Sequence, residues 1–416
     1  MCKQVALDDL TLTVWRIILA GGLLCAMKLK SKHLRHPLRT AKLAKALLAE
    51  RINMARFADR GERCFAGDPR FDLRSVTAGF AARLDDRSAD ATLLERICTA
   101  YIKAVETQQS AREAYRASEW WEQVRQGSLR PVMQALLNRD IPALQTMYRN
   151  FFRDPCSTGL IGVPYGASRA RFSVKDANRR FYLIDVLYRI DYWMAQTDGR
   201  FALRDLAGPG VGNPFGVIMD GTLVEAGAEY RHYCAHRVAS LLDSEKGVVA
   251  EIGGGFGGMA YYLLRDRSGV TYLDFDVPES LALASYYLMK AFPQLRFLLF
   301  GEETLTKEAI ACADVALMPV FELATMPAGS VDVTFSSHAV SDISLDAAAE
   351  YLRHIARITR SGFLFIGSND ASQALSDLIE RRGDSFRMVE TRSSGWHSHK
   401  IPPVDETECL FRVGAA

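Results

Sequence analysis

The chain has 416 residues, more than one typical domain, so its length favours two structural regions. A hydrophobic content of 49% and a charged content of 24% are typical of a soluble globular protein. The formal net charge of +2 argues against a dedicated nucleic-acid-binding protein. The eight cysteines are scattered, without a C-x-x-C pair or a zinc-site spacing, which indicates reduced thiols in a cytosolic protein.

The first 45 residues combine an apolar run with basic residues. Residues 10–27 are mostly apolar, but Arg16 leaves only 17–27 uncharged, and that stretch is too short to cross a bilayer as a helix. Lysines and arginines follow, so one interpretation of residues 1–45 is a leader at the interface of an anionic membrane. The other is a leader outside the native protein, which would then begin at Met27. We expect a cytoplasmic protein, attached peripherally to the inner face of the cell membrane if the first interpretation holds.

Helical periodicity dominates residues 46–147. The spacing of apolar residues predicts one helix over 40–61 and a longer one over 91–126. Gly127 and Pro131 then interrupt the pattern. No catalytic constellation is visible here, so we expect a helical N-terminal region.

The amino-acid composition and the periodicity change in residues 148–228. Aromatic, Arg, Pro and Gly residues follow one another without periodicity over 148–166, which is typical of a shaped loop over a site and also of a domain linker. An aromatic-rich helix is predicted over 176–197, and residues 208–221 are rich in turn formers. We expect a cap or substrate region in this part of the chain.

An apolar run near the middle of the chain ends in a glycine cluster. Residues 248–252 predict a strand, residues 253–258 contain five glycines, and apolar residues then resume at helical spacing. Glycine permits positive φ and lets backbone N–H groups approach a ligand, while the following helix N-terminus carries partial positive charge. The segment therefore predicts a strand, a ligand-binding turn and a helix, with a turn that binds nothing as the alternative.

Two cofactors could use this turn. Gly253, Gly255 and Gly258 fit the fingerprint G-x-G-x-x-G, which would make the chain an NAD(P)-dependent oxidoreductase of a sugar or nucleotide sugar. Glu251 instead opens an E-x-G-x-G-x-G frame that ends at Gly257. An acid at this position suits the free amino group of S-adenosylmethionine and gives a dinucleotide no obvious partner.

Residues near the turn supply further candidate cofactor contacts. A second strand, predicted over 270–275, delivers Asp276 at the distance where a nucleotide ribose presents its hydroxyl groups. The helix predicted over 229–242 leads directly into the glycine strand. It brings Tyr230, Arg231, His232 and Tyr233 close to the turn, where any one of them could contact the cofactor.

Strands and helices continue to alternate beyond Ser280. Strands are predicted over 295–300, 315–318, 331–336 and 363–366, and helices up to 291 and over 345–358. This alternation predicts a parallel, doubly wound sheet. Residues 386–391 and 408–413 predict two strands without a clear helix between them, and such a terminal hairpin is typical of methyltransferases rather than dehydrogenases. We therefore expect an α/β fold, with a Rossmann-like class I methyltransferase sheet in residues 229–416.

Candidate catalytic residues follow the strands, because ligands of open α/β sheets lie at the carboxyl ends of the strands. Ser336 is a candidate cofactor contact, and His338 is the natural base. A sugar hydroxyl must lose its proton as the methyl group moves, and an imidazole, with an ordinary pKa of about 6.5, can accept that proton. A histidine that only hydrogen-bonds the backbone is the alternative.

A metal site is a rival arrangement. Asp342, Asn369 and Asp370 could supply oxygen ligands for a Mg²⁺ ion that lowers the pKa of the acceptor hydroxyl. Asn369 and Asp370 suit a helix cap equally well, so we favour a site without metal. His397 and His399 indicate a mobile polar loop rather than zinc, since no third ligand is near them in sequence.

Three segments carry a family resemblance. EIGGGFGG (251–258), LDFDVPESLALASYYL (273–288) and FSSHAVSDIS (335–344) resemble the sugar O-methyltransferases of bacterial polysaccharide clusters, and the likeness covers roughly residues 148–413. It implies S-adenosylmethionine as the cofactor and a sugar hydroxyl of a cell-surface glycan or its precursor as the acceptor. A non-catalytic scaffold of glycan assembly is the remaining alternative, and the presence of Glu251, Asp276 and His338 disfavours it.

A more distant resemblance assigns roles. D-V-P-E and H-A-V-S-D are similar to segments of small-molecule O-methyltransferases in which the aspartate holds the ribose and the histidine is the base. Carried over, Asp276 is the ribose ligand and His338 the base. Those enzymes place a further acid near the adenine, and Glu302 and Glu322 compete for that role here.

Overall fold

The computed structural model describes residues 37–84, 90–162, 176–341, 343–381 and 385–414. Most of the expected leader, including the apolar run over 10–27, lies outside these residues, as does Asp342. None of the helices in the described ranges combines the length and the apolar character needed to cross a membrane. The prediction of an interfacial leader is therefore not tested by the structure.

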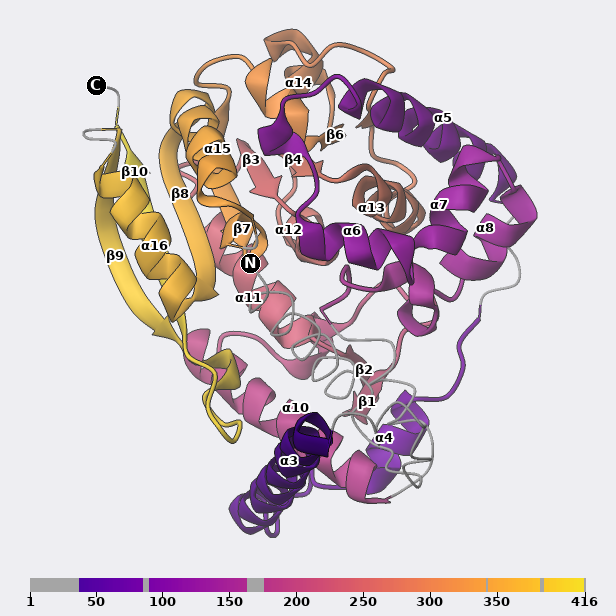
Figure 1. The fold of residues 1–416 in the computed structure, drawn as a ribbon, viewed down its shortest axis with the longest axis vertical. Coiled ribbons are helices and arrows are strands. Elements are labelled where there is room, and N and C mark those ends of the chain that lie inside the picture. The colour runs from indigo at the N-terminus through magenta and orange to yellow at the C-terminus, as the bar shows by residue number, and fades with distance from the viewer. Residues whose placement is uncertain (1–36, 85–89, 163–175, 342, 382–384, 415–416) are drawn as a thin grey trace.

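A single large sheet forms the centre of the molecule (Figure 1). It has eight strands in the order β5-β6-β4-β3-β7-β8-β10-β9. The strands are β3 (Gly247–Ile252), β4 (Val270–Asp276), β5 (Phe297–Leu299), β6 (Val315–Pro319), β7 (Val331–Ser337), β8 (Thr359–Ser368), β9 (Phe386–Ser394) and β10 (Glu406–Val413). The strands from β5 to β8 run parallel, whereas β10 pairs antiparallel with both β8 and β9. The expected Rossmann-like sheet with a terminal antiparallel hairpin is confirmed.

Helices cover both faces of this sheet. Successive residues of each strand point to opposite sides, and both sides carry apolar residues that the helices bury. Val249 and Tyr272 belong to one apolar core, and their chain neighbours Ala250 and Leu273 belong to another. The first core includes α11 (Ala228–Ala239), α12 (Gly258–Asp266) and α13 (Pro278–Ala291). The second includes α14 (Lys307–Cys312), α15 (Leu345–Ile358) and α16 (Asn369–Glu380). The sheet is therefore doubly wound, as the alternation of elements predicts.

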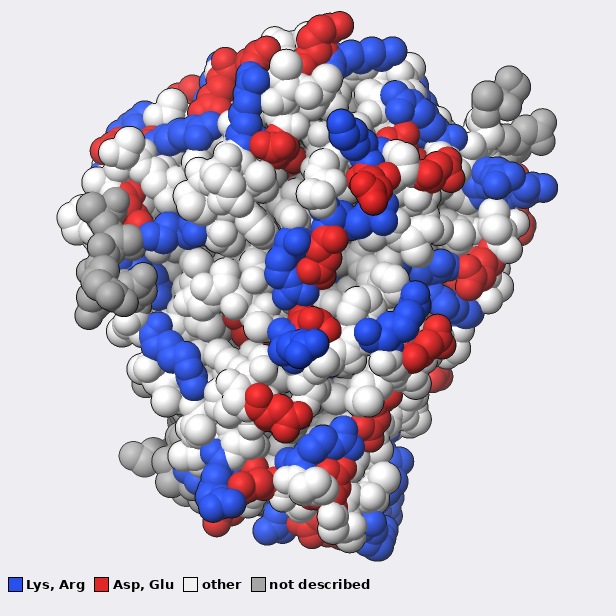
Figure 2. Space-filling model, turned by 180° about the vertical axis from the view of Figure 1, so that it is seen from behind, with Lys and Arg blue, Asp and Glu red and all other residues white. Residues whose placement is uncertain are grey.

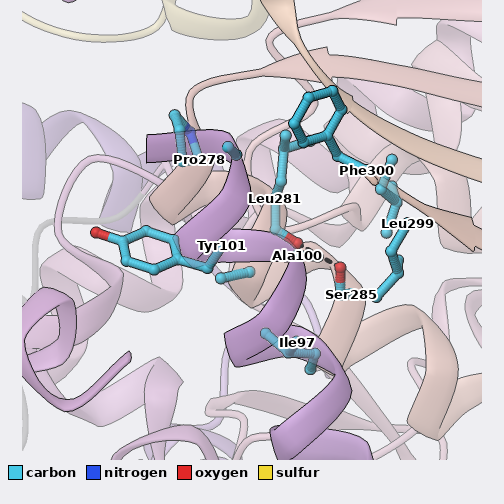
Figure 3. A pocket seen from close by; sticks show the side chains of 11 residues that line it. Ile97, Ala100, Tyr101, Pro278, Leu281, Ser285, Leu299 and Phe300 are labelled. Carbon is cyan, nitrogen blue, oxygen red and sulfur yellow. Dashed lines mark hydrogen bonds between the residues drawn. The ribbon is translucent and has the colours of Figure 1, made fainter. Parts of the chain in front are cut away.

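The N-terminal region is helical and extends the first core. Its helices are α3 (Pro37–Cys64), α4 (Leu73–Gly79), α5 (Ala91–Gln108), α6 (Glu119–Gln126), α7 (Arg130–Leu137) and α8 (Ile141–Tyr148). The expected cap region contributes α10 (Asp176–Gln196) to the same core. Figure 3 shows Ile97 and Ala100 of α5 beside Leu281 and Ser285 of α13, and these residues line a small apolar cavity of about 20 Å³. That volume suffices for about one water molecule, so the seam between the two helices is closely packed.

The long helix predicted over 91–126 is wrong, because the chain turns after Gln108 and restarts as α6. A short 3₁₀ helix, Glu113–Tyr115, lies between the two. The Tyr115 hydroxyl hydrogen-bonds Nε2 of His354 at 2.7 Å, and the Ser118 side chain caps α6 by accepting from the Trp121 N–H. These contacts with α15 and with the cap override the local helical periodicity.

A two-stranded hairpin lies in the region expected to contain turns. It consists of β1 (Gly216–Met219) and β2 (Thr222–Glu225), joined through Asp220 and Gly221, both with positive φ. Such a two-residue turn matches the twist of a tight hairpin. The hairpin delivers Glu225 and Gly227 to the start of α11.

Charges of both signs cover the face shown in Figure 2. Lys and Arg side chains alternate there with Asp and Glu, and the described residues on that face form no extended patch of one sign. This distribution agrees with the near-neutral net charge of the sequence.

Candidate functional site

The glycine turn follows β3, the strand at which the strand order of the sheet changes direction. β3 pairs with β4 on one side and with β7 on the other, so the crevice at their carboxyl ends is the switch point at which open α/β sheets bind ligands. Gly253, Gly255 and Gly257 have φ of 83°, 62° and 84°, a region that L side chains rarely adopt. The predicted turn between a strand and a helix is therefore present, with its glycines in the conformations that require glycine.

A pocket of about 330 Å³ opens beside this turn. It is enclosed by the glycine turn, the segment 159–162, α10, α11, the end of β7 and the 3₁₀ helix Gly395–His397. Of the residues predicted from sequence, the pocket brings together Glu251, Gly253, Gly255 and His338. A candidate cofactor turn and a candidate base therefore share one cavity.

Glu251 contributes a buried carboxyl group to the pocket. It is 4% exposed and accepts a hydrogen bond of 2.6 Å from the Tyr272 hydroxyl. Burial raises the pKa of Glu251 to about 7, an effect that the Tyr272 hydrogen bond opposes and the nearby Asp276 reinforces. A positively charged ligand group in the pocket would favour the ionised form of this carboxyl.

Two more acids lie beneath the turn. Oδ1 of Asp274 accepts from the Gly254 N–H at 3.1 Å, while its Oδ2 is buried without a hydrogen-bond partner among the described residues. Asp276 accepts from the Gly255 N–H at 2.9 Å and from the Ser280 hydroxyl at 2.6 Å. Burial raises the pKa of Asp276 to about 6 and that of Asp274 well above its ordinary value.

Together these acids make the turn a cation-binding environment. In the described part of the chain, Glu251, Asp274 and Asp276 form no ion pair with a lysine or arginine. Burial raises the pKa of all three carboxyls and so favours their neutral forms, whereas a cation bound nearby would favour the charged forms. S-adenosylmethionine carries an ammonium and a sulfonium group, so this donor set fits it, with Glu251 as the carboxyl that faces the pocket. Asp276 instead holds the turn in this structure, and its ribose role stays a prediction.

His338 stands at the end of β7 with an unusual backbone. Its φ is 65°, which is uncommon for a residue other than glycine and costs on the order of 1 kcal/mol or more. The His338 N–H donates to the Ile366 carbonyl at 2.8 Å, which fixes the turn to the neighbouring strand β8. The imidazole lines the pocket with 40% of its side chain exposed. The strained backbone therefore directs an accessible ring into the cavity.

The carboxyl group of Glu406 lies close to the His338 imidazole. Oε1 of Glu406 is 3.6 Å from Nε2 of His338 and 3.2 Å from Nδ1 of His397, which also lines the pocket. Burial would raise the pKa of Glu406, but the hydrogen bond from His397 and the positive charge of the histidines bring it below the ordinary value. One buried carboxylate thus lies within 4 Å of two histidines of the pocket.

Sequence reasoning missed Glu406 and Arg189. Glu406 comes from β10, the strand between β8 and β9, and no local pattern links it to His338. Arg189 lies in the aromatic-rich helix α10, whose stripe is typical of a core, yet its side chain lines the pocket. No local signal singles out Arg189, because the same helix also contains Arg179, Arg180, Asp185 and Asp191.

Besides Asp276 and Glu302, three more predicted cofactor contacts lie outside the pocket lining: Tyr233, Ser336 and Gly257. The Tyr233 hydroxyl donates to Glu408 at 2.7 Å, so Tyr230, bonded to Ser337 at 2.6 Å, is the tyrosine of α11 that lines the pocket. The Ser336 hydroxyl donates to the Ile252 carbonyl at 3.0 Å and ties β7 to β3. Gly257 is the N-cap of α12.

Neither candidate for the adenine acid faces this pocket. Glu302 follows the edge strand β5 and is paired with Arg96 at 2.6 Å. Burial opposes ionisation of Glu302, but the hydrogen bond from Arg96 leaves its pKa below the ordinary value. Glu322 follows β6 and accepts from the Thr325 hydroxyl at 2.8 Å. The choice between the two stays open.

The proposed metal ligands have other roles in the structure. Asn369 and Asp370 form the first turn of α16, where the Ser368 side chain caps the helix by accepting from the Ala371 N–H. Oδ1 of Asn369 accepts from the Thr407 hydroxyl at 2.6 Å. Asp342 lies outside the described residues, and within them no cluster of three or more His, Cys, Asp or Glu residues could hold a metal ion. The expectation that Asn369 or Asp370 caps this helix is wrong, because Ser368 is its N-cap and both residues lie inside the first turn.

Comparisons with known proteins give no close relative. No family model matches the chain, and no curated protein matches its sequence. Solved structures match parts of it. The small RNA methyltransferase HEN1 is 14% identical with a TM-score of 0.34, and the match covers 46% of this chain and 26% of that one. Magnesium protoporphyrin IX methyltransferase from Synechocystis PCC 6803 with bound SAM is 12% identical with a TM-score of 0.31, and the match covers 55% of this chain and 97% of that one. N-methyltransferase NodS from Bradyrhizobium japonicum WM9 in complex with S-adenosyl-L-homocysteine is 11% identical with a TM-score of 0.32, and the match covers 45% of this chain and 88% of that one. The chain thus spans only about a quarter of the HEN1 structure. Similarity at these TM-scores carries no functional argument, so function has to be argued from the site.

Proposed function

We propose that this protein is an S-adenosylmethionine-dependent methyltransferase that acts on a sugar hydroxyl of a cell-surface glycan or its precursor. One observation carries the proposal: the Glu251 carboxyl, the glycine turn and the His338 imidazole line the same pocket. The first two provide an environment for a cationic cofactor, and the third provides a base for the acceptor. A sugar as the acceptor is supported by the family resemblance of the three sequence segments.

The cofactor side of the site depends on charge. When bound, S-adenosylmethionine supplies an electrophilic methyl group on a sulfonium. The buried acids of the turn favour such a cation, since each has a pKa raised by burial and gains a counter-charge on binding. The positive φ values of Gly253 and Gly255 allow the backbone to approach the ligand closely.

The acceptor side depends on His338. Its ring accepts the proton of the hydroxyl as the oxygen attacks, and the positive charge then formed is stabilised by the Glu406 carboxylate 3.6 Å away. The separation exceeds an ordinary hydrogen bond, so Glu406 acts on the ring through charge and position.

Calorimetry tests the choice of cofactor. S-adenosylhomocysteine should bind the full-length protein with micromolar affinity, whereas NADH should not bind. The fingerprint of Gly253, Gly255 and Gly258 also fits a dinucleotide. Binding of NADH without S-adenosylhomocysteine would therefore overturn the methyltransferase proposal in favour of an oxidoreductase.

We also propose a peripheral contact with anionic membranes through the N-terminal segment. The described part of α3 exposes Leu48 and Ile52, at 59% and 43%, one helical turn apart. Arg51 lies between them in sequence and is also exposed. Exposed apolar residues beside basic ones are what an interfacial helix presents to a lipid surface.

A further inference from the structure

Two arginines form one wall of the pocket. Arg189 of α10 and Arg231 of α11 are both largely buried, with 16% and 12% of their side chains exposed. Both guanidinium groups approach Gly227: a Cβ atom on that residue would lie 3.0 Å from Nη1 of Arg231 and 3.9 Å from Nη2 of Arg189. Two like charges therefore converge on one point, which costs free energy unless negative charge neutralises them.

Two buried glutamates neutralise this wall incompletely. Arg189 is paired with Glu229. Nη2 of Arg231 is 3.6 Å from Oε2 of Glu225, beyond an ordinary hydrogen bond, and has no hydrogen-bond partner among the described residues. Burial raises the pKa of Glu225 to about 7, so part of this carboxyl population is neutral near neutral pH. Buried Asp185 adds negative charge near Arg189, so the unsatisfied group of this wall is the buried N–H donor of Arg231.

The start of α11 adds to the positive potential. Gly227 is the N-cap residue of this helix, with a φ of 82°, and supplies no side-chain cap. The first backbone N–H groups of a helix carry partial positive charge and favour an anion. Glu229 lies in this first turn but is already engaged with Arg189.

We propose that Arg189 and Arg231 together bind one anionic group, a carboxylate or a phosphate, of a molecule in the pocket. Guanidinium groups present paired N–H donors whose geometry matches the oxygens of both anions. The source of the anion rests on the proposed function, under which two molecules share the pocket. It is either the amino-acid carboxylate of the cofactor or an acidic group of the acceptor. The second source would narrow the acceptors to uronic acids and phosphorylated sugars.

Three variants of the full-length chain test this site. Arg231→Gln removes one guanidinium, and the double variant Arg189→Gln with Glu229→Gln removes the other together with its buried partner, so that no charge is left unpaired. Arg237→Gln is the matched control. Arg237 lies on the same helix with 18% of its side chain exposed, is paired with Glu408, and does not line the pocket. Thermal melting verifies the fold, and Arg231→Lys replaces Arg231→Gln if that variant unfolds.

Calorimetry with three probes separates the sources. S-adenosylhomocysteine contains the amino-acid carboxylate, 5′-methylthioadenosine lacks it, and inorganic phosphate is titrated into the complex with S-adenosylhomocysteine. If the cofactor supplies the anion, the pocket variants bind S-adenosylhomocysteine at least roughly tenfold more weakly and methylthioadenosine unchanged. If the acceptor supplies it, affinity for S-adenosylhomocysteine is unchanged and phosphate binding falls by at least roughly tenfold.

Either pattern supports the anion site and identifies its source. The inference is overturned if the pocket variants bind all three probes as the Arg237→Gln control does. Failure of the unmodified protein to bind S-adenosylhomocysteine would contradict the proposed function instead. Phosphate would then be titrated into the protein alone, and loss of its binding in the pocket variants would still support the site.

Discussion

Oε1 of Glu406 lies 3.6 Å from Nε2 of His338, although Glu406 begins β10 and His338 directly follows β7. Their proximity depends on the insertion of β10 between β8 and β9, which brings the start of β10 beside the end of β8 and thus near β7. The carboxylate is buried while the imidazole is partly exposed. The pair therefore fits the proposed role of His338 as a base whose positive charge is stabilised by the Glu406 carboxylate.

Glu406→Gln should lower turnover by at least about tenfold, because the amide no longer stabilises the positive ring that forms on proton transfer. Affinity for S-adenosylhomocysteine should stay within about twofold, since Glu406 does not line the pocket beside the glycine turn. Steady-state kinetics and calorimetry measure the two effects. Glu390→Gln, in the same terminal hairpin but paired with Arg237, is the control and should keep full turnover.

His338→Asn should reduce turnover by about 100-fold or more while leaving cofactor affinity nearly unchanged. Asparagine tolerates positive φ better than alanine, so it removes the base with less added backbone strain at the φ of 65°. Turnover is measured with and without EDTA, which should have no effect on the unmodified enzyme.

The magnesium alternative makes the opposite prediction for the same assay. Activity would disappear in EDTA and return with added Mg²⁺, and Asp370→Ala would be as damaging as the histidine change. A His338→Asn variant with full turnover in EDTA would contradict both mechanisms and leave substrate positioning, for which Tyr230 is the next residue to change.

Cofactor affinity should depend on pH through Glu251. Its pKa is raised to about 7 in the folded protein, so the carboxyl is mostly charged above pH 7 and mostly neutral well below it. The ammonium group of S-adenosylhomocysteine interacts better with the charged carboxylate, so the affinity for this ligand should fall as pH falls from 8 to 6. Calorimetric titration of S-adenosylhomocysteine across this range measures the fall. Glu251→Gln should bind more weakly at pH 8 and show a smaller change with pH; an identical pH dependence in the variant would exclude Glu251 as its source.

Glu251 should also affect the free energy of unfolding, and its contribution should fall as pH rises. The folded-state pKa of Glu251, about 7, lies above its ordinary value of 4.5, so the folded state holds the proton more tightly than the unfolded state. The contribution is favourable at low pH and is lost as pH rises from 4.5 to 7, by at most about 1.4 kcal/mol per pH unit. Denaturant unfolding without ligand should show Glu251→Gln gaining stability relative to the unmodified protein over this interval. A constant difference between the two would contradict the buried charge.

Full-length protein should co-sediment with vesicles that contain anionic lipids, and high salt should release part of it. Replacing Leu48 and Ile52 by serine should weaken this binding, because both side chains are exposed on α3. Leu345→Ser is the control, since Leu345 is 61% exposed but lies at the start of α15. Equal sedimentation of all three proteins would show that α3 contributes nothing to membrane contact.

The sequence predicted those features that depend on neighbouring residues. The strand, glycine turn and helix around Glu251, the alternation of parallel strands and the terminal hairpin all have local periodicity or turn chemistry. The break after Gln108 could not be predicted, because it depends on the contact between Tyr115 and His354 in another part of the chain. The same limit applies to Glu406, which strand order brings next to His338, and to Arg189, which helix packing brings to the pocket.

The position of β10 also bears on biosynthesis. Every other strand of the sheet precedes β10 along the chain, so the ribosome releases the glycine turn and His338 well before it releases Glu406. A nascent chain could assemble its cofactor crevice early, yet its base would lack the stabilising carboxylate until β10 enters between β8 and β9. Under the proposed mechanism, the base should therefore reach its full efficiency only after translation of this strand.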